Sequence, residues 1–153
     1  MAFKLPAQLT GDLTEREAIS DALYRAVLSF DHADEALFLS AITDDIDAKM
    51  PASTAHGIAE FKAAVFDRVS KLHTTHFLSN VRINIESSST ATATCSALAQ
   101  HVRPGQGADP SSAKLTSGAF YACDMVKVRH LWKMKTWKAN NIWLDGDPTI
   151  LAG

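Results

Sequence analysis

Two histidines and one aspartate are the residues of this chain best suited to acid–base chemistry. His76 lies in the segment TTHFLSN, just before or within a predicted strand, and His101 lies near the end of a long predicted strand. Asp31 closes the first predicted helix. An imidazole takes and gives protons near neutral pH, and a neighbouring carboxylate fixes its tautomer. Each residue also has a purely structural interpretation, as a frayed helix end, a turn histidine and a strand-end histidine.

The strand that carries His101 has one face of small side chains. Period-two alternation places on this face Ala91, Ala93, Cys95, Ala97, Ala99 and His101, with Thr92, Thr94 and Ser96 on the other. Such a face is typical of a strand that lines a cavity, and equally of a strand that a helix covers closely. Both interpretations predict that the alanines point away from solvent.

The sequence lacks the motifs that several other kinds of chemistry require. The sequence contains no HxH, HExxH, GxGxxG, P-loop or GxSxG motif, so we expect no metal and no cofactor. The glycines of PGQGADP lie between two predicted strands and do not open a helix, which predicts a loop rather than a phosphate site. Cys95 and Cys123 show no metal-ligand spacing, so buried free thiols are expected.

Length and charge set the broad class of protein. With 153 residues and a net charge of −2, the chain fits one globular domain without a global attraction to nucleic acid or anionic membranes. The N-terminus lacks the apolar region of a signal peptide, and no run approaches the roughly 18 apolar residues of a membrane span. We therefore expect no nucleic-acid or membrane partner and a cytoplasmic location.

The order of predicted elements indicates an α+β fold. Thr14 and Glu17 form a capping box at the start of the first helix, after a leader over residues 1–12. Apolar spacing predicts three helices and alternation predicts five strands. The helices are expected at about 14–31, 34–41 and 58–72, and the strands at 46–50, 81–86, 90–103, 115–128 and 131–142. Short turns between the later strands predict a largely antiparallel sheet.

A basic stretch runs along the last predicted strand. Strict alternation would place Lys133, Lys135 and Trp137 on one face. This pattern is typical of a solvated sheet face and less so of a stripe that binds phosphates.

The sequence resembles the nuclear transport factor 2-like superfamily, and within it scytalone dehydratase and the SnoaL-like polyketide cyclases and isomerases. Four stretches carry the resemblance: Tyr24-(x6)-Asp31, Thr75-His76-Phe77, His101-Val102-Arg103 and Leu131-Trp132-Lys133. The resemblance implies a single domain over residues 1–153 with its core at 13–147. The implied fold is a cone-like, curved, mostly antiparallel sheet with three helices on its concave face. It also implies a pocket that works without metal or cofactor, and a homodimer, for which the outer sheet face with Trp137 is the expected interface.

The resemblance also assigns roles to residues of the pocket. The aspartate and two histidines of scytalone dehydratase fall on Asp31, His76 and His101, which implies that Asp31 orients, His76 is the base, and His101 is the acid or second base. An apolar pocket predicts that His101 titrates near neutral pH. Other positions implied to bind substrate are Tyr24, Phe30, Met50, Ala119 and Tyr121.

The sequence departs from the dehydratase at four of these positions. Phe30 and Met50 replace two tyrosines that hold a water on the substrate carbonyl, Tyr121 replaces an asparagine, and Ala119 replaces a serine. Scytalone is therefore not the expected substrate, although Tyr121 could donate to an enolate oxygen.

The function that these observations predict is a small lyase or isomerase. It would act on a small apolar or aromatic intermediate of polyketide-like or other secondary metabolism, by dehydration, double-bond shift or cyclisation. The alternative is a module of the same fold that binds a ligand or a partner without catalysis, because a fold does not fix a function.

Overall fold

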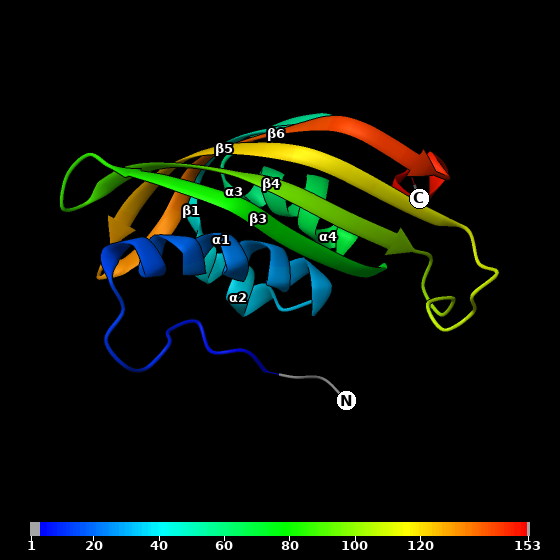
Figure 1. The fold of residues 1–153 in the computed structure, drawn as a ribbon, viewed down its shortest axis with the longest axis horizontal. Coiled ribbons are helices and arrows are strands. Elements are labelled where there is room, and N and C mark those ends of the chain that lie inside the picture. Colours follow the sequence, from blue (N-terminus) through cyan, green and yellow to red (C-terminus); the bar gives the residue numbers. More distant parts are fainter. Residues whose placement is uncertain (1–3, 153) are drawn as a thin grey trace.

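A computed structural model describes residues 4–152. One six-stranded sheet forms the body of the fold, with the strand order β2-β1-β6-β5-β4-β3. The strands are β1 (Ile42–Met50), β2 (Ser53–His56), β3 (His73–Ile85), β4 (Thr90–Val102), β5 (Lys114–Val128) and β6 (Leu131–Gly146). All neighbours pair antiparallel except β1 and β6, which are parallel. The sheet arches over the helices, which lie on its concave side (Figure 1). This arrangement confirms the predicted α+β fold.

The edge formed by β1 and β2 is larger than the sequence suggested. A single short strand was expected at 46–50, but β1 starts at Ile42, directly after α2 (Glu35–Ala41), and β2 folds back on it. Pro51 and Ala52 form the turn between β1 and β2 and do not end the sheet. The reason is that proline is tolerated at a turn, where its missing N–H is not needed by the ladder.

The helix α1 (Glu15–Asp31) brings Asp31 to the concave face of the sheet. Its capping box is present as predicted, because the Thr14 side chain accepts from the Glu17 amide and the Glu17 carboxylate accepts from the Thr14 amide. On its buried side, Arg25 donates to the Ser40 carbonyl of α2 and to the Trp132 carbonyl of β6 at 2.7 Å. These bonds tie the helix to its neighbours, so the last turn has a fixed position.

The segment predicted as one helix over 58–72 is interrupted. It consists of α3 (Ile58–Phe61), a π-helical turn η1 (Lys62–Phe66) and α4 (Asp67–Val69). A π-helical turn inserts an extra residue into the helix and rotates the side chains that follow. Val65 and Phe66 remain buried, and Arg68 and Val69 reach the cavity described below.

The alternation predicted for β4 is confirmed. Ala93, Cys95, Ala97 and Ala99 are all buried on the concave side. The neighbouring strand β3 starts at His73, earlier than the expected Val81, so that His76 lies within the strand. His76 pairs with Ala99, and Thr74 pairs with His101, which brings both histidines to the same end of the concave face.

The prediction that Trp137 lies on the solvated face of the sheet is wrong. Trp137 is 1% exposed and points to the interior, whereas Lys133 and Lys135 do not. The cause is a β-bulge, because Asp124 pairs with Thr136 while Met125 pairs with Met134, which leaves Lys135 as the extra residue. One extra residue moves each later side chain of the strand to the opposite face of the sheet. Trp137 therefore cannot take part in an interface on the outer face.

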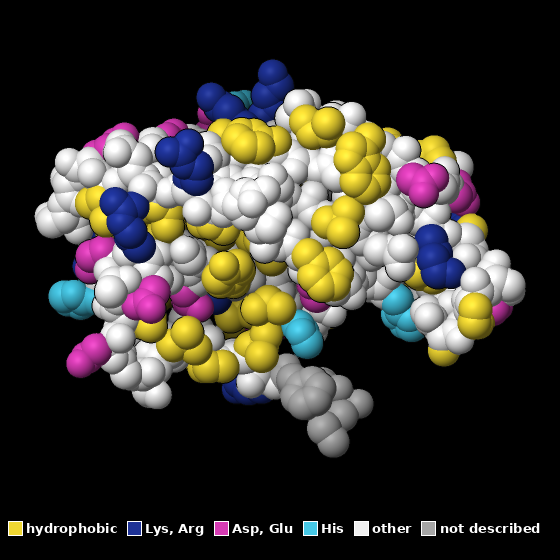
Figure 2. All heavy atoms as spheres, in the orientation of Figure 1, with side chains coloured by type: hydrophobic (Ala, Val, Ile, Leu, Met, Phe, Trp, Pro, Cys, Tyr) yellow, Lys and Arg dark blue, Asp and Glu magenta, His cyan; other side chains and the backbone are white. Residues whose placement is uncertain are grey.

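Other apolar side chains occupy the outer, convex face of the sheet. Phe77, Leu98, Phe120 and Trp143 are each at least 43% exposed. Phe77 pairs with Leu98, Leu98 with Gly118, and Gly118 with Trp143, while Phe120 lies two residues from Gly118 on the same face of β5. We call these four residues the outer apolar patch. Figure 2 shows hydrophobic side chains exposed over the strands of the sheet.

Candidate active site

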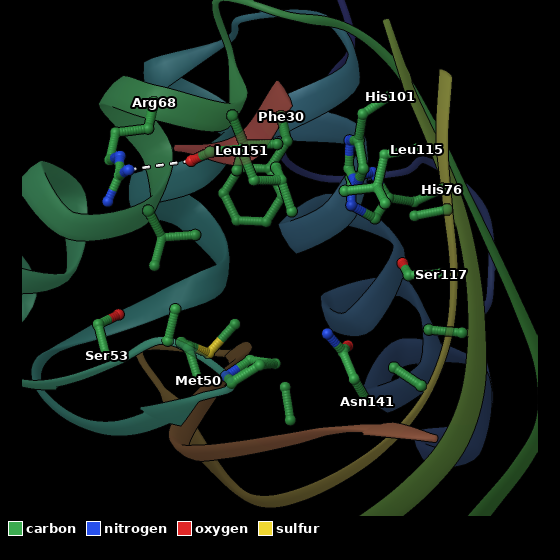
Figure 3. Close-up of a pocket in the computed structure, with 18 of the residues that line it drawn as sticks. Phe30, Met50, Ser53, Arg68, His76, His101, Leu115, Ser117, Asn141 and Leu151 are labelled. Atoms are coloured by element: carbon green, nitrogen blue, oxygen red, sulfur yellow. Dashed lines mark hydrogen bonds between the residues drawn. The ribbon is translucent and has the colours of Figure 1, made fainter. Parts of the chain in front are cut away.

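A cavity of about 620 Å³ lies between the concave face of the sheet and the helices. Every layer of the fold contributes to its wall, from the end of α1 through the 64–69 segment to β3, β4, β5 and β6. The C-terminal 3₁₀ helix η2 (Pro148–Leu151) also borders it, and Arg68 donates to the Leu151 carbonyl at 2.9 Å. Figure 3 shows His76 and His101 at one part of this cavity, with Met50 and Asn141 at another. Its volume is typical of a site for a small organic molecule.

His76 and Asp31 form a closely bonded pair at the cavity wall. The Asp31 carboxylate accepts from His76 Nδ1 at 2.6 Å through one oxygen, and from the His76 backbone N–H at 2.9 Å through the other. Both side chains are less than 10% exposed, at 7% for His76 and 8% for Asp31. Because the carboxylate accepts, the proton of a neutral His76 sits on Nδ1, and the lone pair sits on Nε2. His76 borders the cavity while Asp31 supports it from behind.

His101 lies against His76. The two rings meet edge to face with centroids 5.4 Å apart, and Thr74 Oγ1 is 2.7 Å from His101 Nδ1. Burial, reinforced by the nearby His76, lowers the pKa of His101 to about 4. The expectation that His101 titrates near neutral pH is therefore wrong. The reason is that desolvation disfavours the imidazolium, and the Asp31 charge offsets this only in part.

The five residues expected to bind substrate divide into two groups. Phe30, Met50, Ala119 and Tyr121 all border the cavity. Tyr24 does not, and it is 41% exposed. Tyr24 shares a helical stripe with Asp31 but lies two turns earlier, about 10 Å along the axis. A shared stripe was therefore not enough to bring Tyr24 to the site.

The structure adds polar residues that the sequence analysis did not identify. Ser117 of β5 and Asn141 of β6 border the cavity, as does Trp137. Trp137 was missed because the bulge cannot be read from alternation. Asn141 shares the strand face of Trp137 and was missed for the same reason, whereas Ser117 shares the face of Ala119 on β5, so that strand alternation could have identified it.

The two cysteines are buried in the core and supply no nucleophile. Cys95 and Cys123 are free and buried, and burial raises the pKa of Cys95 to about 11, so that neither is a thiolate nucleophile. Within residues 4–152, no group of three or more His, Cys, Asp or Glu side chains could hold a metal ion. In the same part of the chain, no helix is both long and apolar enough to span a membrane.

A helix-lined, curved sheet around an apolar cavity with an Asp–His pair defines the class of protein, a nuclear transport factor 2-like α+β domain. Residues 11–138 match the family model of the SnoaL-like domain, and the chain belongs to this family. It is 43% identical to terrestric acid biosynthesis cluster protein E of Penicillium crustosum, with 97% of this chain and 96% of the relative aligned.

Solved structures show the same fold at lower identity. A candidate scytalone dehydratase from Novosphingobium aromaticivorans matches with a TM-score of 0.75 and 20% identity, over 87% of each chain. The LinA-type3 hexachlorocyclohexane dehydrochlorinase of Novosphingobium barchaimii matches with a TM-score of 0.70 and 16% identity, over 87% of this chain and 90% of that chain. These likenesses concern the fold.

Proposed function

We propose that this protein is a cofactor-independent lyase or isomerase that removes a proton α to a carbonyl group, with His76 as the base. The single observation that carries the proposal is the Asp31–His76 pair at the wall of the cavity. Asp31 holds both the ring and the backbone of His76, so that Nε2 is the nitrogen left to receive a proton. A base held in one tautomer and one orientation loses little entropy on reaching the transition state.

The reaction starts with transfer of the α proton to His76 Nε2. The C–H electron pair moves toward the carbonyl, and an enolate forms beside the new imidazolium. Asp31 stabilises this imidazolium through the bond at Nδ1. The proton on His76 Nε2 is then returned in one of three ways: to a β-hydroxyl group that the enolate expels as water, to another carbon of the enolate, or to the oxygen of a second carbonyl that the enolate attacks. These outcomes are dehydration, isomerisation and cyclisation.

His101 acts in this scheme as a neutral imidazole. With a pKa of about 4 it carries no charge at pH 7, so that it cannot supply a proton as imidazolium. When the Thr74 hydroxyl donates to Nδ1, the other nitrogen carries the hydrogen and donates a hydrogen bond within the cavity. This places a donor next to His76, where a leaving hydroxyl or an enolate oxygen would lie.

The substrate is proposed to be an apolar or aromatic intermediate of secondary metabolism. The relative from Penicillium crustosum is named for the biosynthesis cluster of terrestric acid, and the alignment with it covers nearly the whole chain. The cavity wall is mostly apolar, with Phe30, Val65 and Leu115 among its residues. Such a wall favours a substrate of polyketide type over a charged metabolite.

The chain is also proposed to form a homodimer through the outer apolar patch. Phe77, Leu98 and Trp143 lie along one cross-strand row that passes through Gly118, and Phe120 lies two residues from Gly118 on the same face of β5. The four side chains are exposed and apolar. A patch of this kind is self-complementary about a two-fold axis, which suits a second copy of the chain.

Turnover assays on oxygenated polyketide-type compounds test the proposed activity. Mass spectrometry distinguishes loss of water from an isomerisation or cyclisation that leaves the mass unchanged. We expect His76→Ala to lower turnover by roughly 10²–10⁴-fold, while the exposed control His130→Ala leaves it unchanged. Equal turnover by His76→Ala and the wild type would refute His76 as the base, and no turnover by the wild type on any such compound would favour the non-catalytic binding module instead.

A further inference from the structure

One polar atom in the cavity wall has no partner. The indole nitrogen of Trp137 is buried, and it has no hydrogen-bond partner among residues 4–152. Trp137 is 1% exposed and borders the cavity. Buried donors without a partner are rare in native proteins because they lose their bond to water without a replacement. A hydrogen-bond acceptor on a bound ligand would satisfy this nitrogen.

The other two tryptophans show that the unpaired donor is specific to Trp137. The Trp132 indole is equally buried, but its Nε1 donates to the Glu15 carboxylate at 2.9 Å. Trp143 is 47% exposed and lies on the outer face. Among the residues that the structure describes, the other buried side-chain polar atom without a partner is Thr43 Oγ1, which does not border the cavity, so that Trp137 is the tryptophan whose donor is left unpaired at the cavity wall.

The Trp137 ring is held firmly in place. Phe30 stacks on it with centroids 6.0 Å apart and planes 19° apart. Phe61 and Tyr121 meet it edge to face at 5.7 Å and 5.2 Å. Three aromatic neighbours and the bulge at Lys135 fix the ring orientation, so that the N–H is preorganised.

The position of Trp137 suits a group that lies some distance from the base. Phe30 contacts the His76 ring at 5.8 Å on one side and the Trp137 ring on the other, so Phe30 lies between the base and the donor. Tyr121 adds a hydroxyl next to Trp137, and burial raises the pKa of Tyr121, which keeps this hydroxyl protonated and able to donate. By contrast, Phe30 and Met50, which also border the cavity, offer no donor.

We propose that the Trp137 indole N–H binds a carbonyl oxygen of the substrate, so that the substrate is a ketone, an ester or another carbonyl compound. An indole N–H only donates, so its partner must be an acceptor such as a carbonyl oxygen. The inference rests on the proposed function in taking the cavity as the substrate site. Because Phe30 lies between His76 and Trp137, this carbonyl is remote from the reacting carbon, and Trp137 orients the substrate with Tyr121 as its neighbour.

Indole N–H resonances of ¹⁵N-labelled protein test this inference directly. The three tryptophans give three indole signals, which are assigned with Trp→Phe variants. The probes are α-tetralone, a bicyclic aromatic ketone, and tetralin, the hydrocarbon of nearly the same shape. We expect saturating α-tetralone to move the Trp137 signal downfield, as hydrogen bonding does, and tetralin not to do so. Equal displacement by both probes, or none by the ketone, would overturn the inference.

Affinity provides the second measurement. Trp137→Phe keeps most of the ring and removes the donor, so binding of α-tetralone should weaken about 3- to 10-fold while binding of tetralin stays the same. Trp143→Phe, the matched control on the outer face, should change neither. Unchanged ketone affinity in Trp137→Phe would also overturn the inference.

The test separates this inference from the proposed catalysis. It measures binding without turnover, and the Trp137 signal should move in the same way in His76→Ala. A downfield shift combined with full turnover by His76→Ala would refute the proposed base and leave the carbonyl site intact. Loss of turnover in His76→Ala without any ketone-specific shift would refute the carbonyl site alone.

Discussion

The buried imidazole of His101 should make the protein less stable in mild acid. His101 is 4% exposed, and its pKa falls from 6.5 to about 4 in the folded protein. In the unfolded chain it binds a proton near pH 6.5, and in the folded protein it does not. The unfolded state therefore binds more protons between these two values, so that stability rises with pH across this window. Stability from this group is fully present above pH 6.5 and is lost as pH falls to about 4.

The size of the effect follows from the same two pKa values. Each pH unit of the window is worth about 1.4 kcal/mol, so that His101 alone removes about 3 kcal/mol of unfolding free energy by pH 4. His101→Asn abolishes this contribution, because asparagine does not titrate. Its side-chain amide lies near the position of Nδ1, so it can keep the hydrogen bond to Thr74.

Denaturant unfolding of the wild type and His101→Asn at pH 7, 6, 5 and 4 measures this difference. We expect the variant to lose about 3 kcal/mol less than the wild type over this range. His130→Asn, at an exposed turn with a φ of 68° that asparagine tolerates, is the control and should follow the wild type. Parallel curves for the wild type and His101→Asn would refute the reasoning, because His101 would then not be held neutral by burial.

Three further predictions concern other parts of the fold. Asp31→Asn should lower turnover less than His76→Ala does, because it removes only the charge and the fixed tautomer of the base; steady-state kinetics on the folded variants check this order. Thr14→Ala should cost about 1 kcal/mol of unfolding free energy through loss of the α1 cap, whereas Thr10→Ala in the exposed leader should cost nothing measurable. Sedimentation at micromolar concentration should show a dimer for the wild type and a monomer for Phe120→Lys, and a wild-type monomer would contradict the outer apolar patch as the interface.

Most of the secondary structure could be predicted from the sequence because the signals for helices and strands are local. The capping box at Thr14 and Glu17 marked the start of α1, and alternation in β4 gave the correct buried face. These features depend on neighbours a few residues apart. The convergence of Asp31 and His76, which lie 45 residues apart, became visible only through the resemblance to a family.

The features that the sequence did not reveal depend on single irregularities in the backbone. One extra residue at Lys135 turned Trp137 inward, and one π-helical turn divided the helix expected at 58–72. Neither has a composition signal, since both are set by the packing of the surrounding elements. The depressed pKa of His101 is another such case, because it arises from burial and from the approach of His76.

Hydrogen exchange at a substrate-like ketone tests the proposed base most directly. The α hydrogens of α-tetralone exchange with heavy water when a base removes them, and NMR follows their loss without knowledge of the natural substrate. We predict that the wild-type protein accelerates this exchange, and that His76→Ala reduces the acceleration by roughly 10²–10⁴-fold while His130→Ala does not. Exchange at the wild-type rate in His76→Ala would contradict the assignment of His76 as the base.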